Sequence, residues 1–326
     1  MHDFFIIALI AIALFFDYTN GFHDSANAIA TVVSTRALSP RMALLMAASL
    51  NIVGAFFTTH VAATVGKGIV PPEAVNERVI LAALLGAITW NLVTWYLGIP
   101  SSSSHALIGG IAGAGVFSAG FQTVNWSNIL FKILSPAVWS CVLGLTAGFS
   151  LMVLFNHLFF KNSPSQMNKV FRKLQVLSAA GMAFAHGTSD AQKTMGIITM
   201  ALVSKGILRD FSIPSWVIYA CALVMGLGTA AGGWRIIKTI GMRVIKIEPV
   251  QGFCAETCAA TSILIAAHLG MPVSSTHVIS SAIMGVGASR RLSAVRWGVA
   301  GNIVIAWLLT IPAAALLAGF FTLFLH

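Results

Sequence analysis

Charged residues are scarce in this chain, and acids are the scarcest of them. Only 9% of the 326 residues are charged, only nine are Asp or Glu, and 57% are hydrophobic. A typical soluble domain carries about 25% charged residues. A chain this poor in charge cannot cover a water-facing surface of ordinary size. The composition therefore excludes an ordinary soluble protein and predicts an integral membrane protein.

Cysteine is also rare, and the four cysteines all fall in apolar segments: Cys141, Cys221, Cys254 and Cys258. The last two lie four residues apart and would share a helix face. No His or Cys partner gives them the spacing of zinc ligands. We interpret the cysteines as small packing residues, and we expect no cofactor.

Basic residues outnumber acids, with 19 Lys and Arg and a net charge of +10. They are spread over the loops between apolar segments, with Lys193 as the exception. A nucleic-acid-binding protein would gather them on one face or stripe. The distribution argues against a nucleic-acid partner and is typical of the positive-inside effect in a protein whose surroundings are the lipid bilayer.

About ten apolar segments approach the length of about 20 residues that a membrane-spanning helix needs. The first is interpreted as a retained span, because it lacks the basic start and cleavage site of a signal peptide. The first and sixth are interrupted by the polar runs DYTNGFHDSAN and AHGTSDAQK, and the fourth and ninth are short and rich in Gly and Ser. Broken or re-entrant helices are therefore expected. The segments are 3–33, 42–65, 79–99, 101–120, 129–160, 171–203, 215–234, 252–271, 273–288 and 297–325.

The loop charges predict an orientation. If the N-terminus lies outside, most of the Lys and Arg residues fall in loops assigned to the inside. The central 161–173 loop carries Lys161, Lys169, Arg172 and Lys173, and is therefore predicted to be cytoplasmic, in a multi-pass protein of the inner membrane.

Two polar motifs of the first half recur in the second half in the same order. Residues 21–27 (GFHDSAN) align with 187–193 (GTSDAQK), and 100–105 (PSSSSH) align with 272–277 (PVSSTH). With five segments per half, the second copy enters the membrane from the opposite side. The sequence thus predicts an all-α polytopic fold with an inverted-topology repeat and roughly 10–12 membrane segments. The predicted parts are a first repeat (1–160), the connecting loop (161–173) and a second repeat (174–326).

The serine runs suit an oxyanion. A proline break followed by a first helical turn offers free N–H groups, hydroxyls and the positive end of the helix dipole, all of which attract an anion. Two such turns that meet from opposite sides could surround a tetrahedral ion, although one run alone is as readily a helix cap. His105 and His277 follow the runs and could donate to the anion, accept its proton or bond a backbone carbonyl.

The acids within apolar segments suit a small cation or a proton, because carboxylate and amide oxygens are hard ligands. Asp17 and Asp24 lie seven apart, on one face of an unbroken helix. Lys193 is interpreted as a charge-neutralising partner of Asp190 in preference to an anion ligand. Glu256 is a candidate proton relay, with Asp190 as its hypothetical partner.

These residues resemble the inorganic phosphate transporter (PiT) family, and within it the bacterial low-affinity branch. The likeness is carried by NGFHDSANAIATVVSTRALSP, WNLVTWYLGIPSSSSHALIGG, AHGTSDAQKTMGI and GMPVSSTHVISSAIMGVGASRRLSAVRWGVAG. The resemblance implies a secondary transporter with inverted repeats and no enzymatic activity. Residue by residue, it implies that phosphate is held by Ser102, Ser103, Ser104, Ser274, Ser275 and Thr276. It implies that Asp24, Asn27 and Asp190 form the coupling side, to which we add Glu256, with His105, His277, Lys193 and Asp17 in support.

The chain departs from the family at three places: His23 and Ser189 stand where Asn is usual, and Asn51 stands where many sodium-coupled relatives carry an acid. Losing oxygen ligands weakens the case for sodium. We therefore expect proton coupling, with phosphate carried alone or as a neutral complex with a divalent metal. A sodium-coupled phosphate symporter and a sulfate transporter of the same fold stay open, and a homodimer is compatible with the sequence.

An intramembrane hydrolase using Ser, His and Asp is the alternative from another class. The chain has no Gly-x-Ser-x-Gly-like elbow, and no single serine stands out as a nucleophile. We therefore expect a transporter.

Overall fold

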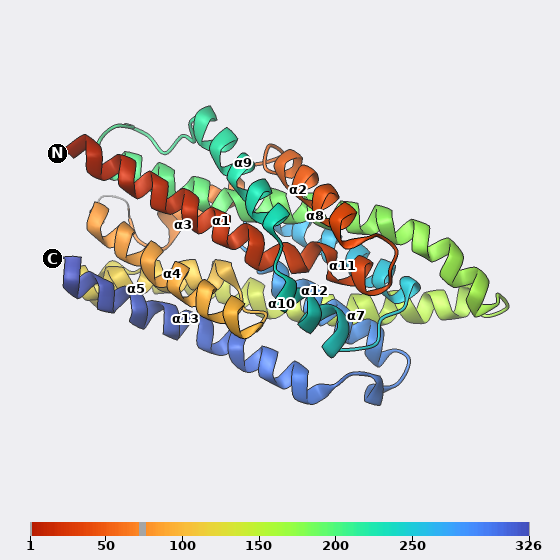
Figure 1. Cartoon of the computed structure of the whole chain (residues 1–326). Coiled ribbons are helices and arrows are strands. Elements are labelled where there is room, and N and C mark those ends of the chain that lie inside the picture. Colours follow the sequence, from red (N-terminus) through yellow and green to blue (C-terminus); the bar gives the residue numbers. More distant parts are fainter. Residues whose placement is uncertain (1, 72–75, 326) are drawn as a thin grey trace.

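The computed structural model describes residues 2–71 and 76–325, which form helices joined by short connections (Figure 1). Within these described residues, five helices are long and apolar enough to cross a membrane, or up to six when one bent pair is counted as a span. The all-helical, polytopic fold is thus confirmed. The α-helices are α1 (His2–Ser34), α2 (Pro40–Gly54), α3 (His60–Gly68), α4 (Glu77–Leu97), α5 (Ser103–Ala119), α6 (Trp126–Asn128), α7 (Ser135–Leu158), α8 (Pro164–Ser204), α9 (Ser215–Ala231), α10 (Trp234–Lys238), α11 (Pro249–His268), α12 (Ser275–Ala288) and α13 (Trp297–Leu325). Short turns of 3-10 helix (Phe121–Thr123, Leu292–Ala294) and π-helix (Ile129–Leu134, Thr239–Arg243) complete the set.

The polar runs do not break the first and sixth segments, contrary to expectation. Helices α1 and α8 are continuous over 33 and 41 residues. Neither run contains proline, and their glycines serve close packing. A Cβ on Gly21 would collide with the backbone of α9, and a Cβ on Gly187 with that of α2. The glycines therefore let two long helices each cross a neighbour at backbone contact.

The breaks lie instead in segments 42–65 and 215–234, which the hydropathy pattern presents as single spans. The first divides into α2 and α3 around residues 55–59. The second divides at Gly232, whose φ of 75° ends α9, and the helix then turns by 60° into α10 and the π-helix. Discontinuous helices of this kind are typical of transporters, where the freed backbone groups lie inside protein.

Two helical hairpins form the centre of the bundle. Helices α4 and α5 are joined by a tip around Gly98, and α11 and α12 by a tip around Gly270, with φ angles of 67° and 69° that favour glycine. The second arms, α5 and α12, have 17 and 14 residues. At 1.5 Å per residue they are about 25 and 21 Å long, less than the roughly 30 Å of a bilayer core. The fourth and ninth segments are thus short helices, as the re-entrant prediction requires.

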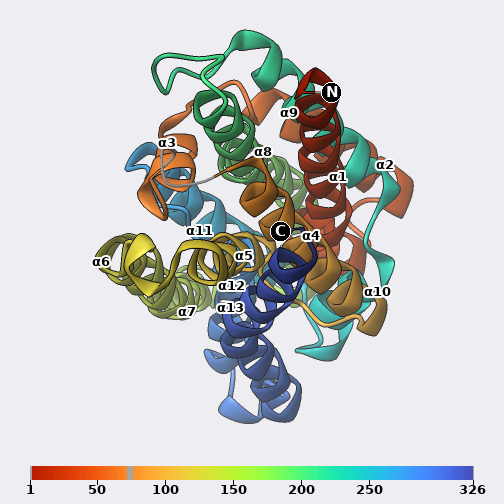
Figure 2. The same cartoon turned by 90° about the vertical axis from the view of Figure 1, so that its left-hand side faces the viewer.

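The hairpins point in opposite directions. The end of α5, at Ser118, lies with Asn76 and Leu325 at the end of the bundle that carries both termini (Figures 1 and 2). Arg290, just after α12, lies with Asn156 near the end of α7 at the other end. Equivalent helices of the two halves also pack in equivalent ways. Helix α5 packs on α13 and its equivalent α12 packs on α7. Likewise, α1 packs on α9 and its equivalent α8 packs on α2.

Each hairpin tip is held by a broken helix of the opposite half. The Thr64 hydroxyl of α3 donates to the Gly270 carbonyl oxygen at 2.7 Å. The Thr239 hydroxyl, at the start of the π-helix after α10, donates to the Gly98 carbonyl oxygen at 2.8 Å. These two bonds are equivalent under the internal symmetry, and we call them the tip contacts.

Residues 161–173 differ from the prediction of a loop. Helix α8 begins at Pro164, after Ser163, whose hydroxyl accepts from the Gln166 amide at 3.3 Å. A serine N-cap followed by proline is a strong start signal, so the helix takes in most of the basic segment.

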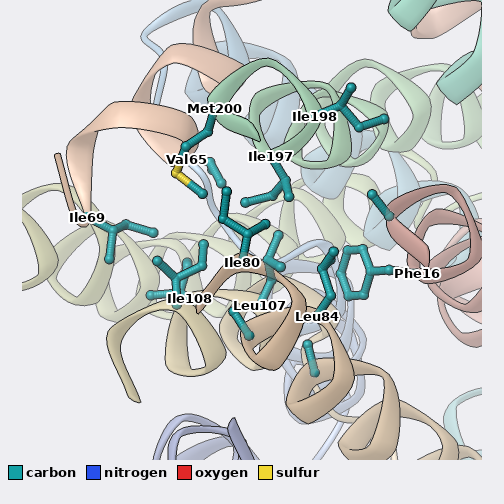
Figure 3. Close-up of a cluster of buried hydrophobic side chains, with 14 of the residues drawn as sticks. Phe16, Val65, Ile69, Ile80, Leu84, Leu107, Ile108, Ile197, Ile198 and Met200 are labelled. Atoms are coloured by element: carbon teal, nitrogen blue, oxygen red, sulfur yellow. The ribbon is translucent and has the colours of Figure 1, made fainter. Parts of the chain in front are cut away.

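Apolar side chains fill the space between the helices in two large clusters. The first joins α1, α3, α4, α5 and α8, and Figure 3 shows Phe16, Leu84, Ile80 and Ile197 converging there. The second surrounds α11 and α12 and also includes residues of α1, α2, α7 and α8. The polar residues described next lie among side chains that exclude water.

Candidate functional site

The serine motifs stand at the N-termini of α5 and α12. Ser102 and Ser274 have extended backbone and act as N-caps, because their hydroxyls accept the His105 and His277 amides at 3.2 and 3.3 Å. Of the six hydroxyls expected to hold substrate, these two are thus engaged in capping. The helices themselves begin at Ser103 and Ser275.

Ser103 and Ser275 each contact the acid of their own half. The Ser103 hydroxyl lies 2.5 Å from Asp24 Oδ2 and 2.5 Å from Asn20 Oδ1. The Ser275 hydroxyl lies 3.4 Å from Asp190 Oδ2, a longer contact. Both acids are buried, at 2% and 0% exposure, so the hydroxyls meet carboxylates away from water.

The next residue of each motif contacts the opposite half. Lys193 Nζ donates to the Ser104 hydroxyl, and Asn27 Nδ2 donates to the Thr276 hydroxyl at 2.9 Å. Asn27 and Lys193 are equivalent positions of the repeat, as are Ser104 and Thr276. Four two-fold-related contacts therefore bring α1, α5, α8 and α12 together at one point.

His105 and His277 meet across this point. Their ring centroids are 4.7 Å apart in an edge-to-face arrangement, and neither Nε2 has a hydrogen-bond partner among the described residues. The His277 ring stacks on Trp307 at 4.1 Å, and the Trp307 indole donates to the Pro100 carbonyl at 3.0 Å. The two histidines are thus packed beside the hydroxyls, with a free nitrogen each.

The acids of the two halves are close enough to share a cation. One ligand atom each from Asp24, His186 and Asp190 lie within 4.8 Å of one another, and all three residues are buried. Lys193 Nζ also lies 2.6 Å from Asp190 Oδ1, so the expected Lys–Asp pair exists and reaches the serine motif as well. Carboxylates and imidazole can hold a proton or a divalent metal ion.

Several polar residues were not assigned to the site from the sequence. His23 Nδ1 lies 2.8 Å from Asp24, and its Nε2 lies 3.1 Å from the Thr94 hydroxyl of α4. His186 lies one turn before Asp190, with Asn51 Oδ1 3.2 Å from its other nitrogen. The i,i+4 spacing from Asp190 was the signal that could have identified His186. Nothing in the local sequence marks Thr94.

Glu256 does not meet Asp190, contrary to the hypothesis. Its carboxylate accepts from Thr31 of α1 and from Gln175 and Ser178 of α8, with the Gln175 amide at 3.2 Å. The reason is the position of Glu256 along α11, which places it at the level of Thr31 of α1. Thr31 lies one helical turn beyond Asn27, so Glu256 occupies a separate buried cluster on the side of the α1 C-terminus.

This architecture, a multi-pass membrane protein whose two hairpins meet at a buried polar point, is typical of membrane transporters. The chain belongs to the Phosphate transporter family, whose model matches residues 20–318. It is 51% identical to a Rhizobium meliloti protein and 49% identical to a Bacillus subtilis protein, each described as a probable low-affinity inorganic phosphate transporter. These matches cover 96% of this chain and 94% and 95% of those proteins. A solved structure titled the sodium-dependent phosphate transporter matches with a TM-score of 0.87 at 28% identity, over 98% of both chains.

Proposed function

We propose that this chain is a secondary symporter that imports inorganic phosphate and binds it between the tips of the two hairpins. The observation that carries the proposal is the two-fold set of contacts made by Ser103, Ser104, Ser275 and Thr276. Hydroxyls, free helical N–H groups and two helix dipoles converge on one point, which suits a tetrahedral oxyanion. In this proposal the repeats are 1–160 and 174–326, joined through 161–173.

Phosphate is favoured over sulfate because Asp24 and Asp190 stand among the donors. Monohydrogen phosphate can donate a hydrogen bond to a carboxylate, whereas sulfate can only accept and would be repelled. The descriptions of the Rhizobium and Bacillus relatives support the same substrate.

A proton is the coupling ion in this proposal. The buried cation group includes the His186 imidazole, and His23 lies against Asp24. Hard cations prefer oxygen ligands, whereas imidazole and carboxylate both take up and release protons. Glu256 is the proposed relay on the far side of Asn27. Sodium is the alternative, since the structural relative is titled sodium-dependent.

The basic end of the bundle is the proposed cytoplasmic end. Lys169, Arg172 and Lys173 on the first turns of α8 lie there, at the end opposite to both termini (Figure 1). This is the arrangement that the positive-inside effect favours. Release on either side then requires one hairpin tip to move, which breaks the tip contact of Thr64 or of Thr239.

The test is phosphate uptake into proteoliposomes that contain the whole chain. An imposed pH gradient is compared with a sodium gradient, with and without magnesium, and with sulfate in place of phosphate. Uptake driven by the pH gradient and specific for phosphate is expected. Strict dependence on sodium would refute proton coupling, and dependence on magnesium would identify a metal–phosphate complex as the substrate. Sulfate uptake without phosphate uptake would refute the substrate.

A further inference from the structure

Asp17 is a buried acid that the phosphate site does not use. It lies on α1 two turns before Asp24, with no exposed surface. The Thr194 hydroxyl of α8 donates to its Oδ1 at 2.8 Å. Within residues 2–71 and 76–325, its second oxygen has no hydrogen-bond partner and its carboxylate is in no ion pair.

A charged carboxylate in this position would be costly, because burying an ion without a partner is among the most expensive changes in a protein. Asp17 interacts electrostatically with Asp190 and Lys193 on α8 and with Cys221 on α9. Lys193 is already bonded to Asp190 and Ser104. Helix α4, which also packs on α1, carries no acidic or basic side chain between Arg78 and its end. Asp17 must therefore hold a proton or gain a cation.

The internal repeat shows that packing does not require an acid here. Asp24 and Asp190 are equivalent, so the equivalents of Asp17 and Thr194 are Ala183 and Ala28. Both alanines are fully buried. The positions that carry a carboxyl and a hydroxyl in one half thus carry two buried methyl groups in the other. A group present on one side only suits a process with a direction, such as moving an ion across the membrane.

A polar residue on the same face of α1 as Asp17 is hydrogen-bonded to the proposed phosphate site. Asn20 follows Asp17 by three residues, on the same face of α1. Its Oδ1 accepts from Ser103, which also lies 2.5 Å from Asp24. Its Nδ2 has no partner among the described residues. The Asn20 side chain, one helical turn from Asp17, is therefore bonded to a hydroxyl of the proposed phosphate site.

We propose that Asp17 binds and releases the coupling proton on the side of the site that faces the N-terminus. The step is a simple protonation: one proton from the outer water joins the free carboxylate oxygen, and the same proton leaves it when phosphate is carried inward. Phe16, the neighbour of Asp17 in the chain, packs beside Leu84 in an apolar cluster (Figure 3), and in this proposal Asp17 meets water only when the packing around it opens. The proposal rests on proton-coupled phosphate import as the proposed function.

The test separates coupling from binding. Asp17→Asn keeps the size of the side chain and an acceptor for Thr194, but cannot bind a proton at neutral pH. In proteoliposomes, phosphate–phosphate exchange at equal pH reports on binding and on the conformational cycle, and uptake driven by a pH gradient, with proton flux read by an internal dye, reports on coupling. The variant is expected to keep exchange and to lose both gradient-driven accumulation and the accompanying proton flux.

Three further variants interpret the result. Asp17→Glu should retain coupling, and Thr194→Val, which removes only the hydroxyl partner, should retain it too. Asp17→Ala, with the residue found at the equivalent position 183, is assayed in the same way and keeps the test open if Asp17→Asn does not fold. Normal proton flux in Asp17→Asn, or equal loss of exchange and coupling in both neutral variants, would overturn the proposal. A wild-type protein without proton flux would instead refute the proposed function.

Discussion

Removing one hydroxyl from each hairpin tip tests the paired site most directly. Ser103→Ala deletes a group within 2.5 Å of both Asp24 and Asn20, and Ser275→Ala deletes the equivalent group at 3.4 Å from Asp190. In the proposed site each hydroxyl donates to an anion, and hydrogen bonds to charged groups contribute about 1.5–3 kcal/mol. At about 1.4 kcal/mol per factor of ten, each variant should lower kcat/KM for phosphate about 10- to 150-fold.

The assay is initial phosphate uptake in proteoliposomes at matched protein incorporation, with Ser280→Ala as the control. Ser280 lies on α12, is 1% exposed, and has no hydrogen-bond partner for its hydroxyl among the described residues. Its removal should leave uptake unchanged. The double variant should lose about the sum of the two free energies if both hydroxyls hold one ion independently. Normal uptake by both single variants would refute the paired site.

The remaining predictions concern stability, and each is measured by thermal unfolding in detergent. Gly187→Ala should destabilise the protein by about 1–3 kcal/mol, since its Cβ meets the backbone of α2. Gly181→Ala, on the same helix with open space around it, should be neutral or stabilise by up to about 1 kcal/mol, and equal effects of the two would contradict the packing. Lys193→Met leaves the Asp190 carboxylate buried without its partner and should cost about 3–5 kcal/mol, a loss that a second change, Asp190→Asn, should partly reverse. Glu256→Gln puts an NH2 group in place of one accepting oxygen, so that it faces either the Ser178 hydroxyl or the Thr31 and Gln175 donors, and should cost about 1–3 kcal/mol; an unchanged melting temperature would argue against the hydrogen bonds seen there.

Patterns formed by neighbouring residues predicted helix starts and helix faces correctly. Proline followed by serines predicted helix starts, which the structure places at Ser103 and Ser275. The seven-residue spacing of Asp17 and Asp24 predicted a shared helix face, and α1 is indeed unbroken there. Helix continuity was misjudged because polarity was taken as a sign of breakage. In a buried bundle, polar residues in a helix find partners on other helices, whereas a pair such as Gly232 and Gly233 ends the helix.

Contacts between segments far apart in the chain could not be predicted from local sequence patterns. Glu256 was assigned to Asp190 because both are buried acids, and only the relative depths of α11, α1 and α8 decide that its partners are Thr31, Gln175 and Ser178. The spacing of His186 from Asp190 placed both on one face of α8, but only the tertiary structure brings Asp24 of the other half beside them.

By itself, the sequence determined that this chain lies in a membrane, that its two halves repeat, and that hydroxyl runs begin two of its helices. Composition, the order of the repeated motifs and the residues that start a helix can all be read from the sequence before the chain folds. Only the tertiary structure decided that the two hydroxyl runs face each other, that each contacts its own half through an acid and the other half through Lys193 or Asn27, and that Asp17 keeps a carboxylate oxygen without a partner. Those contacts depend on how four helices cross one another. The crossings depend in turn on glycine contacts and hairpin lengths throughout the bundle, which no single stretch of sequence specifies.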